Sequence, residues 1–549
     1  MTQTAAQLVI KCLEAQGVEF IYGIPGAKID TVFDAIVDSN IRLILCRHEQ
    51  NAAFMAAAYG RKTGKPGVVL VTSGPGVANL PTGLLTATTE GDPIVALGGN
   101  VGLDMKFKET HQNTDNAKLL EPVTKSSIEV TRPEVIPEAI ANAFRLATAP
   151  KSGACFISLP QDVLKEQTTA QPCQHLPQIA YGHASTSTID EACKKIASAK
   201  QPILLVGQEA TRDENTKAII DLVKKHKIPV ISTYQGAGVI PKDLVECFYG
   251  RVGLFKNQPG DRLLAKADVV ITVGYNLFEY DPEIWNADMS REIVHIDYTP
   301  ANIHNQYQPS YELLGNIDEN LEILSKHITS INAEPHPELH QELFNRIDEG
   351  KDKVGKNNSV HPLRLVYEIN KIMDDDTIIC CDIGSVYMWL ARYLISHKPH
   401  QLLFSNGQQT LGVALPWGMG IKLAYPNKKI ITVSGDGGFL FSAVELETAV
   451  REKIKFTHFV WRDGHYNMVQ EQQIMKYKRE SGVKLGTVDI PKFADAFGTK
   501  GYYITNPDDI ANTYAETLKN DLPSLIEVEV DYSDNMSMFT VAHDPELGN

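Results

Sequence analysis

The sequence predicts an α/β protein made of three consecutive doubly wound parallel-sheet domains. Short β-branched runs such as "GVVLVTSG", "ADVVITVG" and "KIITVSG" alternate along the chain with segments of helical periodicity. Continuous apolar strands separated by helices are typical of parallel sheets that are covered on both faces. The length of 549 residues is too great for a single core and favours about three domains.

The predicted strands fall into three groups. Two stretches between them, at roughly 166–188 and 330–362, fill with Pro, His, Gln and small polar residues and are predicted to be surface linkers. The predicted domains are therefore residues 1–165, 189–329 and 360–549. Their most apolar strands are expected at 67–74, 92–99 and 154–160 in the first domain, at 201–207, 228–234, 267–274 and 292–298 in the second, and at 376–384, 429–435, 456–461 and 524–530 in the third.

The composition is that of a soluble globular protein. With 43% hydrophobic residues and a net charge of -15, the chain offers no broad nucleic-acid-binding surface, and no nucleic-acid partner is expected. No run approaches the roughly 20 apolar residues that span a membrane, and the N-terminal segment carries Lys11 and Glu14 within an amphipathic pattern rather than a signal peptide. The eight Cys residues lack metal-ligand spacing. These features predict a cytoplasmic protein with no membrane partner.

One segment is repeated within the chain. Residues 67–99 read strand, "SGPG" turn, helix and strand, and residues 429–461 repeat this order at nearly the same length around "SGDG". The first and third domains are therefore predicted to be variants of one unit. Pro75 fills the place in one turn that Asp436 fills in the other. Because the turn can form without an acid, Asp436 is interpreted as a ligand for a cation.

A second acid is expected beside Asp436. Asp463 follows the next strand along the chain, and the carboxyl ends of neighbouring parallel strands meet at one edge of a sheet. Two carboxylates with loop carbonyls suit Mg2+ or Ca2+. Gly437 and Gly438 would let backbone N–H groups approach a phosphate, aided by a helix expected to begin near Phe441 with a capping box at Ser442 and Glu445.

The pattern of GDG followed by a short polar pair resembles the motif of enzymes that depend on thiamine diphosphate. Those enzymes usually end the motif with Asn-Asn, whereas this chain has Asp463-Gly464. The resemblance implies Mg2+ as the metal, with Asp436, Asp463 and the backbone carbonyl of His465 as its protein ligands. It also implies that the diphosphate end of the cofactor is bound by Gly435, Gly437, Gly438 and Tyr466.

The same resemblance implies a second half of the site in the first domain. Glu49 lies in an "HE-x-x-A" context between a strand and a small-residue helix, where the family carries a carboxylate that bonds the cofactor's aminopyrimidine ring. A Glu at a helix start is also favourable for the helix dipole alone. Pro25 and Gly26 form a Gly-Pro turn of the kind that lines the pyrimidine pocket, and Gln112 occupies the place of an active-site glutamine.

Over essentially its whole length the chain resembles the acetolactate synthases, most closely the catabolic, FAD-independent branch. The resemblance is carried by "GIPGAKID", "RHEQNAAFMAAA", "VTSGPG", "SLPQDV", "SNGQQTLGVALPW" and "SGDGGF", among other stretches. It implies further cofactor contacts from Gly384, Ser385 and Gln409, and from Leu411 as the apolar wedge beneath the bent cofactor. As a lone residue, Leu411 would be interpreted equally well as a core leucine.

FAD is not expected. The biosynthetic relatives carry an Arg-Phe-Asp-Asp-Arg run where this chain reads "VGYNLFEYDPEIW", and a Phe where it has His111. The middle domain contains no GxGxxG fingerprint, although Asp297 ends a predicted strand at the position of a ribose-binding acid.

The implied activity is decarboxylation of pyruvate and condensation with a second pyruvate to give 2-acetolactate and CO2. The residues expected to face the substrate are Gln112, Lys28 and Gln472, although Lys28 and Gln472 could equally be solvated surface residues. The resemblance further implies a homodimer with active sites at the interface, and a homotetramer as its assembly. The alternatives are a biosynthetic acetohydroxyacid synthase, another thiamine-dependent 2-oxoacid decarboxylase, or a non-catalytic scaffold that retains the fold.

Overall fold

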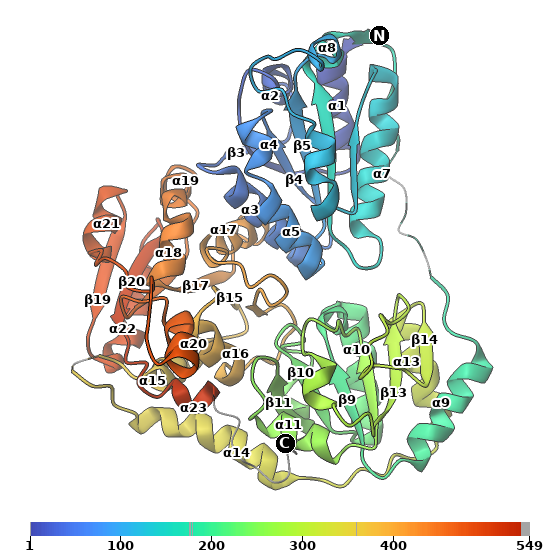
Figure 1. Cartoon of the computed structure of the whole chain (residues 1–549), viewed down its shortest axis with the longest axis vertical. Coiled ribbons are helices and arrows are strands. Elements are labelled where there is room, and N and C mark those ends of the chain that lie inside the picture. Colours follow the sequence, from blue (N-terminus) through green and yellow to red (C-terminus); the bar gives the residue numbers. More distant parts are fainter. Residues whose placement is uncertain (1, 175–176, 178, 180, 358, 540–549) are drawn as a thin grey trace.

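The computed structural model contains three domains, each built on a six-stranded parallel sheet that is flanked by helices (Figure 1). The structure describes residues 2–174, 177, 179, 181–357 and 359–539. The first sheet belongs to the N-terminal part of the chain, the second to the middle and the third to the C-terminal part. The predicted fold class is therefore confirmed.

The first sheet has the strand order β3-β2-β4-β5-β7-β6. On β2, the neighbouring residues Ile21 and Tyr22 belong to two different buried clusters, so both faces of the sheet are covered. Its strands are β2 (Phe20–Ile24), β3 (Arg42–Leu45), β4 (Gly67–Val71), β5 (Ile94–Asn100), β6 (Ser126–Glu129) and β7 (Ala154–Pro160). Its helices are α1 (Ala5–Ala15), α2 (Asp30–Ile36), α3 (Glu49–Thr63), α4 (Pro75–Ala78), α5 (Pro81–Glu90), α6 (Asn116–Leu120), α7 (Ile136–Thr148) and α8 (Gln161–Lys165).

The third sheet repeats that topology strand for strand. Its order is β16-β15-β17-β18-β20-β19, the same arrangement as in the first sheet. Its strands are β15 (Thr377–Cys381), β16 (Leu402–Leu403), β17 (Lys429–Gly435), β18 (Thr457–Arg462), β19 (Lys500–Ile504) and β20 (Ser524–Glu529). Its helices are α15 (Pro362–Ile372), α16 (Ser385–Tyr393), α17 (Ala414–Ala424), α18 (Asp436–Ser442), α19 (Leu446–Arg451), α20 (Asn467–Tyr477), α21 (Ile490–Ala496), α22 (Ile510–Thr517) and α23 (Met536–Phe539). The repeat predicted from "SGPG" and "SGDG" thus extends to the whole sheet.

The middle sheet has a different order, β11-β10-β9-β12-β13-β14, which is that of a dinucleotide-binding fold. Its strands are β9 (Pro202–Val206), β10 (Val230–Thr233), β11 (Phe248–Val252), β12 (Val269–Val273), β13 (Glu292–Asp297) and β14 (Tyr311–Leu314). Its helices are α9 (Thr186–Ser198), α10 (Asp213–His226), α11 (Pro259–Lys266), α12 (Pro282–Trp285) and α13 (Ile317–His327).

The second predicted linker is wrong in part. Residues 330–362 contain α14 (Pro337–Asp348), an amphipathic helix whose Leu339, Leu343 and Ile347 are buried. Its apolar residues recur at helical spacing, but the many Pro, His and charged residues around them led to the prediction of a linker.

The first and third domains pack closely through α3 and α17. Both helices are buried, and α3 is rich in small residues. A Cβ added at Gly420 on α17 would lie 2.2 Å from the carbonyl oxygen of Met55 on α3. The two backbones touch because glycine and alanine leave room between them.

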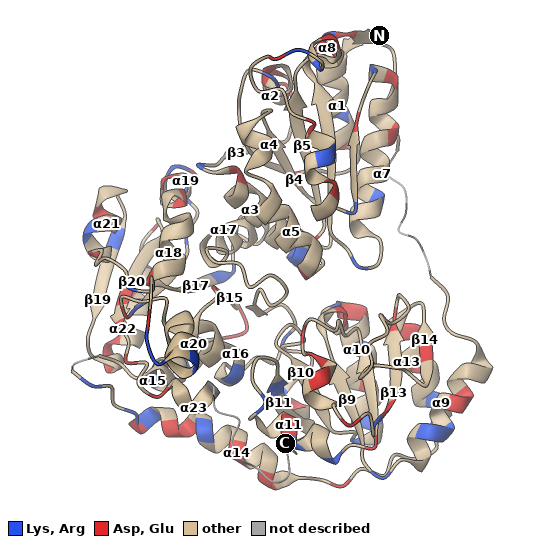
Figure 2. Cartoon of the chain, in the orientation of Figure 1, with Lys and Arg blue, Asp and Glu red and all other residues tan. Residues whose placement is uncertain are grey.

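Charged residues are interspersed over all three domains, with Asp and Glu alternating with Lys and Arg along the outer helices (Figure 2). Among the described residues, no helix is long and apolar enough to cross a membrane. All eight cysteines carry free thiols, and Cys380 and Cys381 lie within the buried strand β15 as expected.

Candidate active site

Glu49 opens α3 directly after β3, at the carboxyl edge of the first sheet. Its side chain is buried, at 9% exposure, and Oε2 accepts a hydrogen bond of 2.9 Å from Nδ2 of Asn79. A Cβ added at Gly76 would lie 3.6 Å from Oε1. Glycine at that position therefore keeps the space beside the second carboxylate oxygen open.

The Gly-Pro turn lies on the same edge. β2 ends at Ile24, and Pro25 and Gly26 follow it. A Cβ added at Gly26 would lie 2.6 Å from the side chain of Thr72, at the end of the neighbouring strand β4. The turn can rest against β4 only because the residue is glycine.

Gln112 reaches this edge from a long loop. Its backbone has a φ of +61°, and its Oε1 accepts a hydrogen bond of 3.4 Å from the hydroxyl of Ser73. Its Cβ is 3.0 Å from the position that a Cβ at Gly74 would occupy. The structure therefore brings Gln112 to the turn that follows β4, within the group formed by Glu49 and Gly26.

The two predicted metal acids lie side by side in the third domain. β17 and β18 are parallel neighbours, and the N–H of Gly464 donates to Oδ2 of Asp436 at 2.9 Å. Burial and the charge of Asp436 raise the pKa of Asp463 to about 7, and burial also raises the pKa of Asp436. Two half-buried neighbouring carboxylates whose ionised forms are disfavoured fit a divalent cation.

Side chains alone do not complete this metal site. Within the described ranges, no group of three or more His, Cys, Asp and Glu residues could hold a metal. The third ligand must then be a backbone or cofactor oxygen. His465 follows Asp463 in the same loop, and no hydrogen bond to its carbonyl oxygen is recorded in the described structure.

Gly437 and Gly438 allow other side chains to pack directly against the turn after β17. A Cβ at Gly437 would lie 2.6 Å from the ring of Tyr466, and one at Gly438 would lie 3.0 Å from the carboxylate of Asp382. Helix α18 begins at Asp436, so the prediction of a helix start near Phe441 with a capping box at Ser442 and Glu445 is wrong. The glycines themselves therefore form the first helical turn, where backbone N–H groups lack helical acceptors.

The other predicted diphosphate residues meet this turn. Gly384 has a φ of +132° and precedes α16, whose first residue is Ser385. The Ser385 hydroxyl donates to Oδ1 of Asn467 at 2.6 Å, beside Tyr466. The ends of β15, β17 and β18 thus converge around one place, which fits the diphosphate and metal of the expected cofactor.

Asp382 is a functional candidate that sequence reasoning missed. It is 1% exposed at the end of β15, and its carboxylate accepts the N–H of Gly412 at 2.9 Å and 3.0 Å. Burial raises its pKa to about 7. Asp382 therefore fixes the loop that carries Leu411 against the loop of Gly438. The sequence feature that could have identified Asp382 is its position as an acid at the end of an apolar strand, which it shares with Asp436.

Of the two remaining predicted substrate residues, Lys28 lies at the sheet edge that carries Glu49, whereas Gln472 lies in the third domain. Gln472 is exposed on α20, a helix with no buried residue, and Lys28 is half-buried in the turn after Gly26. Leu411 is half-buried against the apolar core of the third domain, and Gln409 precedes it with a φ of +49°.

Glu49 and the metal acids form two separate groups in the chain. In the described structure no hydrogen bond or ion pair joins Glu49 to Asp436 or Asp463. Instead, Glu445 binds the turn before Glu49, accepting the N–H groups of Arg47 and His48 at 2.9 Å and 3.0 Å. Glu445 therefore joins the first and third domains and does not act in the predicted capping box.

Three family models match the chain. Residues 3–119 match the N-terminal TPP binding domain of thiamine pyrophosphate enzymes, residues 189–324 match their central domain, and residues 382–528 match their C-terminal TPP binding domain. Thiamine pyrophosphate is another name for thiamine diphosphate.

Curated relatives are similar over the full length. The chain is 48% identical to the acetolactate synthase of Bacillus subtilis, covering 99% of this chain and 96% of that protein. It is 43% identical to the catabolic acetolactate synthase of Raoultella terrigena, covering 98% and 97%. Against the large subunit of acetolactate synthase isozyme 2 of Escherichia coli the identity is 29%, covering 97% and 96%.

Proposed function

The chain belongs to the thiamine pyrophosphate enzyme family, and we propose that it is an acetolactate synthase of the catabolic kind. It joins two molecules of pyruvate to give 2-acetolactate and CO2. The observation that carries the proposal is the full-length identity of 48% and 43% to two acetolactate synthases. The presence of Glu49, Asp436 and Asp463 at sheet edges supports an active enzyme over a scaffold that has only retained the fold.

The residues take the following roles in this proposal. When bound, thiamine diphosphate supplies a carbon nucleophile and an electron sink for the decarboxylation. Glu49 holds the pyrimidine end from its buried position and exchanges a proton with the ring. At the other end, Asp436, Asp463 and the carbonyl of His465 would hold Mg2+. The diphosphate would be held by the loops of Gly384, Ser385, Gly435, Gly437, Gly438 and Tyr466.

The remaining roles concern substrate and shape. Leu411 and Gln409 would contact the cofactor from their loop. Gln112, which lies on the same edge as Glu49, contacts pyruvate, and Lys28 and Gln472 supply further contacts to its carboxylate. Because the carboxylate of a second pyruvate must be bound while water is excluded, exposed Gln472 on α20 would act in the complete assembly rather than in one chain.

We propose that the complete site forms between two chains. The turn before Glu49 is bound to its own chain's third domain by Glu445, yet no hydrogen bond or ion pair among the described residues joins Glu49 to the metal acids. Directly after the GDG motif, Leu440 and Phe441 are 47% and 50% exposed, which suits a face covered by a partner. The minimum assembly is a homodimer, and pairs of dimers would give a homotetramer.

Mixing two inactive variants tests the shared site. Glu49→Gln and Asp436→Ala damage opposite halves, so a mixed dimer would carry one intact site and one doubly damaged site. Random reassortment then restores up to about a quarter of wild-type activity, because half of the dimers are mixed and each has one working site. No recovery after verified subunit exchange would contradict the shared site.

The proposal includes independence from FAD. At the end of β9, where such sheets place the phosphates of a nucleotide, the N–H of Gln208 is bound by the carboxylate of Glu279 at 3.1 Å and 3.2 Å. Glu279 is 1% exposed and also accepts the N–H of Asn276 at 3.0 Å. An internal carboxylate thus occupies a position where an anionic nucleotide would need a donor.

The deciding experiment is pyruvate turnover with Mg2+ and thiamine diphosphate, with and without FAD, measuring acetolactate and acetaldehyde. Acetolactate at the same rate in both samples is expected. Acetaldehyde as the only product would indicate a decarboxylase, and a strict requirement for FAD would indicate a biosynthetic enzyme.

A further inference from the structure

The loop that carries Gln409 and Leu411 is held by residues far from it in the sequence. This cofactor loop, residues 404–412, connects β16 to α17 and contains two residues with positive φ, Gln409 at +49° and Gly412 at +83°. It belongs to no strand or helix. Its shape therefore depends on side chains that satisfy its backbone groups.

Glu90, the last residue of α5 in the first domain, supplies the central contact. It is fully buried, and its Oε1 accepts the N–H of Gly407 at 2.7 Å and the hydroxyl of Ser405 at 3.3 Å. A Cβ at Gly407 would lie 2.2 Å from the side chain of Thr89, so the loop is pressed against α5 at this point.

Arg61 and Asp92 complete a buried charged cluster around Glu90. Arg61 donates to both carboxylate oxygens of Asp92 at 2.7 Å and 2.9 Å, and to the carbonyl of Phe404 at 3.1 Å. It lies 3.6 Å from Oε2 of Glu90, an oxygen that has no hydrogen-bond partner among the described residues, and stacks 4.4 Å from the ring centre of Trp417. One guanidinium thus joins both acids to the first residue of the loop.

Further contacts come from α5 and from the middle domain. The hydroxyls of Thr86 and Thr410 are 2.8 Å apart, and Gln408 donates to Thr89 at 3.0 Å. Asn406 donates to the carbonyl of Glu279 at 2.9 Å. The first and middle domains therefore both form hydrogen bonds with the cofactor loop of the third domain.

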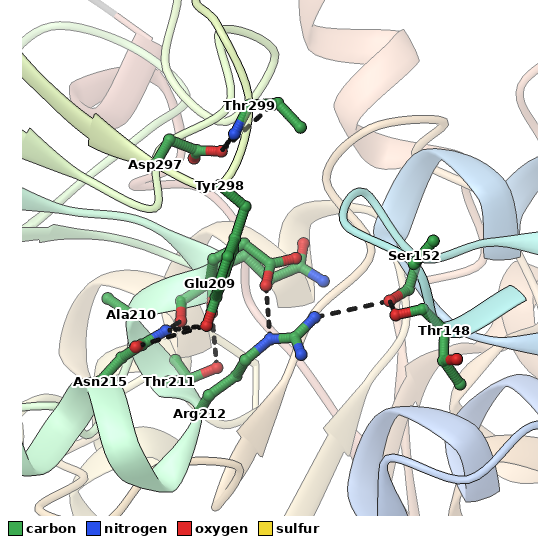
Figure 3. A network of polar contacts seen from close by, with 12 residues as sticks. Thr148, Ser152, Glu209, Ala210, Thr211, Arg212, Asn215, Asp297, Tyr298 and Thr299 are labelled. Atoms are coloured by element: carbon green, nitrogen blue, oxygen red, sulfur yellow. Dashed lines mark hydrogen bonds and ion pairs between the residues drawn. The ribbon is translucent and has the colours of Figure 1, made fainter. Parts of the chain in front are cut away.

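The middle domain also touches the first domain beside this cluster. Gln208 donates to the carbonyl of Glu90. Nearby, Arg212 pairs with Glu209 at 2.5 Å and reaches the Ser152 hydroxyl at 3.5 Å (Figure 3). These contacts border a cavity of about 570 Å³ lined by Thr89, Gln208 and Phe278, among others. They fix the end of α5, and with it the carboxylate that the loop requires.

We propose that Glu90 is a positioning residue for the cofactor: with Arg61 and Asp92 it fixes the backbone of Gly407 and thereby places Gln409 and Leu411. Glu90 acts through the loop and carries out no chemistry. The inference rests on the proposed function only in the assignment of Gln409 and Leu411 to the cofactor.

The test uses a substitution that shortens the side chain and keeps the charge. Glu90→Asp withdraws the acceptor from Gly407 by one methylene but leaves a carboxylate near Arg61. Glu90→Gln keeps an acceptor at the original reach and serves as the rescue. Glu368→Asp is the matched control, because Glu368 is a 1% exposed acid that pairs with Arg364 at 3.0 Å and Lys371 at 2.8 Å, away from the loop.

Hydrogen exchange of residues 404–412 in the cofactor-free protein is the first measurement. Glu90→Asp should accelerate exchange in this segment by about fivefold or more, since the opening free energy of the loop falls. Glu90→Gln should stay within about threefold of wild type, because its amide oxygen still accepts the N–H. Glu368→Asp should leave the segment unchanged. Unchanged protection in Glu90→Asp would overturn the proposal.

The second measurement is the binding of thiamine diphosphate in the presence of Mg2+, followed by calorimetry. Glu90→Asp should raise the Kd about tenfold, which corresponds to about 1.4 kcal/mol. The KM for the cofactor should rise by a similar factor, while kcat at saturating cofactor stays within about threefold of wild type. The reason is that part of the binding energy of the cofactor is used in the variant to order the loop. Equal Kd values in Glu90→Asp and Glu368→Asp would show a merely structural role.

Thr86→Val is a milder check that keeps the shape of the side chain. It removes the hydroxyl that meets Thr410, so a two- to threefold faster exchange of the loop is expected (roughly one lost hydrogen bond). No change there would count against a loop held by α5. If wild-type protein bound no thiamine diphosphate, the proposed function would fail, whereas the exchange result would still decide whether Glu90 orders the loop.

Discussion

Replacing Glu445 tests the contact that joins the two halves of the chain. Its carboxylate accepts the N–H groups of Arg47 and His48, Nδ2 of Asn51 at 3.2 Å and the hydroxyl of Thr448 at 2.7 Å. Glu445→Ala leaves two backbone donors without a protein acceptor in a partly buried interface. Each such group costs about 1–3 kcal/mol. The loss is reduced by the cost of burying the carboxylate, which raises the pKa of Glu445, so we expect a net loss of about 3 kcal/mol.

The assay is scanning calorimetry of the cofactor-free protein together with steady-state kinetics. A loss of about 3 kcal/mol lowers the Tm of a domain of this size by roughly 6–12 °C. Glu447→Ala, two residues along the same segment, is the control, because Glu447 is 39% exposed and its pair with Arg451 at 3.0 Å contributes little. Glu445→Ala should also reduce kcat, since His48 immediately precedes Glu49.

Two results would refute this reasoning. A Tm for Glu445→Ala within about 1 °C of that for Glu447→Ala would mean that water satisfies the N–H groups of Arg47 and His48. A large drop in Tm with unchanged kcat would mean that the turn does not place Glu49. Glu445→Gln should recover most of the Tm, because one amide oxygen can still accept both N–H groups.

Four further predictions follow from the site. Glu49→Gln should reduce kcat by about 100-fold or more with little change in the Kd for thiamine diphosphate, since only the proton-exchanging function is lost; full turnover at saturating cofactor would contradict the role. Asp463→Asn should raise the Kd for Mg2+ several-fold, by roughly 1 kcal/mol, while turnover at saturating Mg2+ is retained. Removing Mg2+ with a chelator should abolish turnover reversibly. An unchanged Kd for Mg2+ in Asp463→Asn would show that Asp463 is not a metal ligand. Gly437→Ala should weaken cofactor binding about tenfold or more, because its Cβ would lie 2.6 Å from Tyr466, and an unaltered Kd would refute the close approach. Burial raises the pKa of Asp382 from 3.8 to about 7, so the folded state binds a proton more tightly than the unfolded state and stability falls as pH rises between these values. The Tm of Asp382→Asn relative to wild type should therefore increase between pH 4 and pH 7 and then level off, whereas a pH-independent difference would oppose it.

The sequence predicts a candidate site because parallel strands deliver their carboxyl ends to one edge. Asp436 and Asp463 follow strands that the spacing made neighbours, and the pairing of β17 with β18 confirms that adjacency. The repeat of "SGPG" and "SGDG" likewise predicted a shared unit, and the identical strand orders of the first and third sheets confirm it. Local patterns were sufficient for all of these inferences.

The buried acids Glu90, Asp382 and Glu445 escaped prediction for a physical reason. Each is held by partners that lie outside its own element, and Glu445 and Arg47 are almost four hundred positions apart. Hydrophobic periodicity reports which face of an element is buried, but not which distant backbone group needs an acceptor. In the sequence, such a residue can be noticed only as an acid among apolar or small residues. Acids that cap helices occur in the same context, so the pattern does not distinguish the two roles.

The duplicated fold explains why the residues of the proposed site lie in two domains. The first sheet carries Glu49 and the Pro75 turn, whereas the third carries Asp436 and Asp463. In the proposed site, neither copy alone would supply both the acid for the cofactor ring and the two carboxylates for the metal. Within one chain, α3 already packs against α17 and Glu445 already binds the turn before Glu49. That pairing leaves the apolar side chains of Leu440 and Phe441 exposed beside the metal acids. In the proposed dimer a second chain supplies the first-domain edge that faces them, and mixing Glu49→Gln with Asp436→Ala tests this directly.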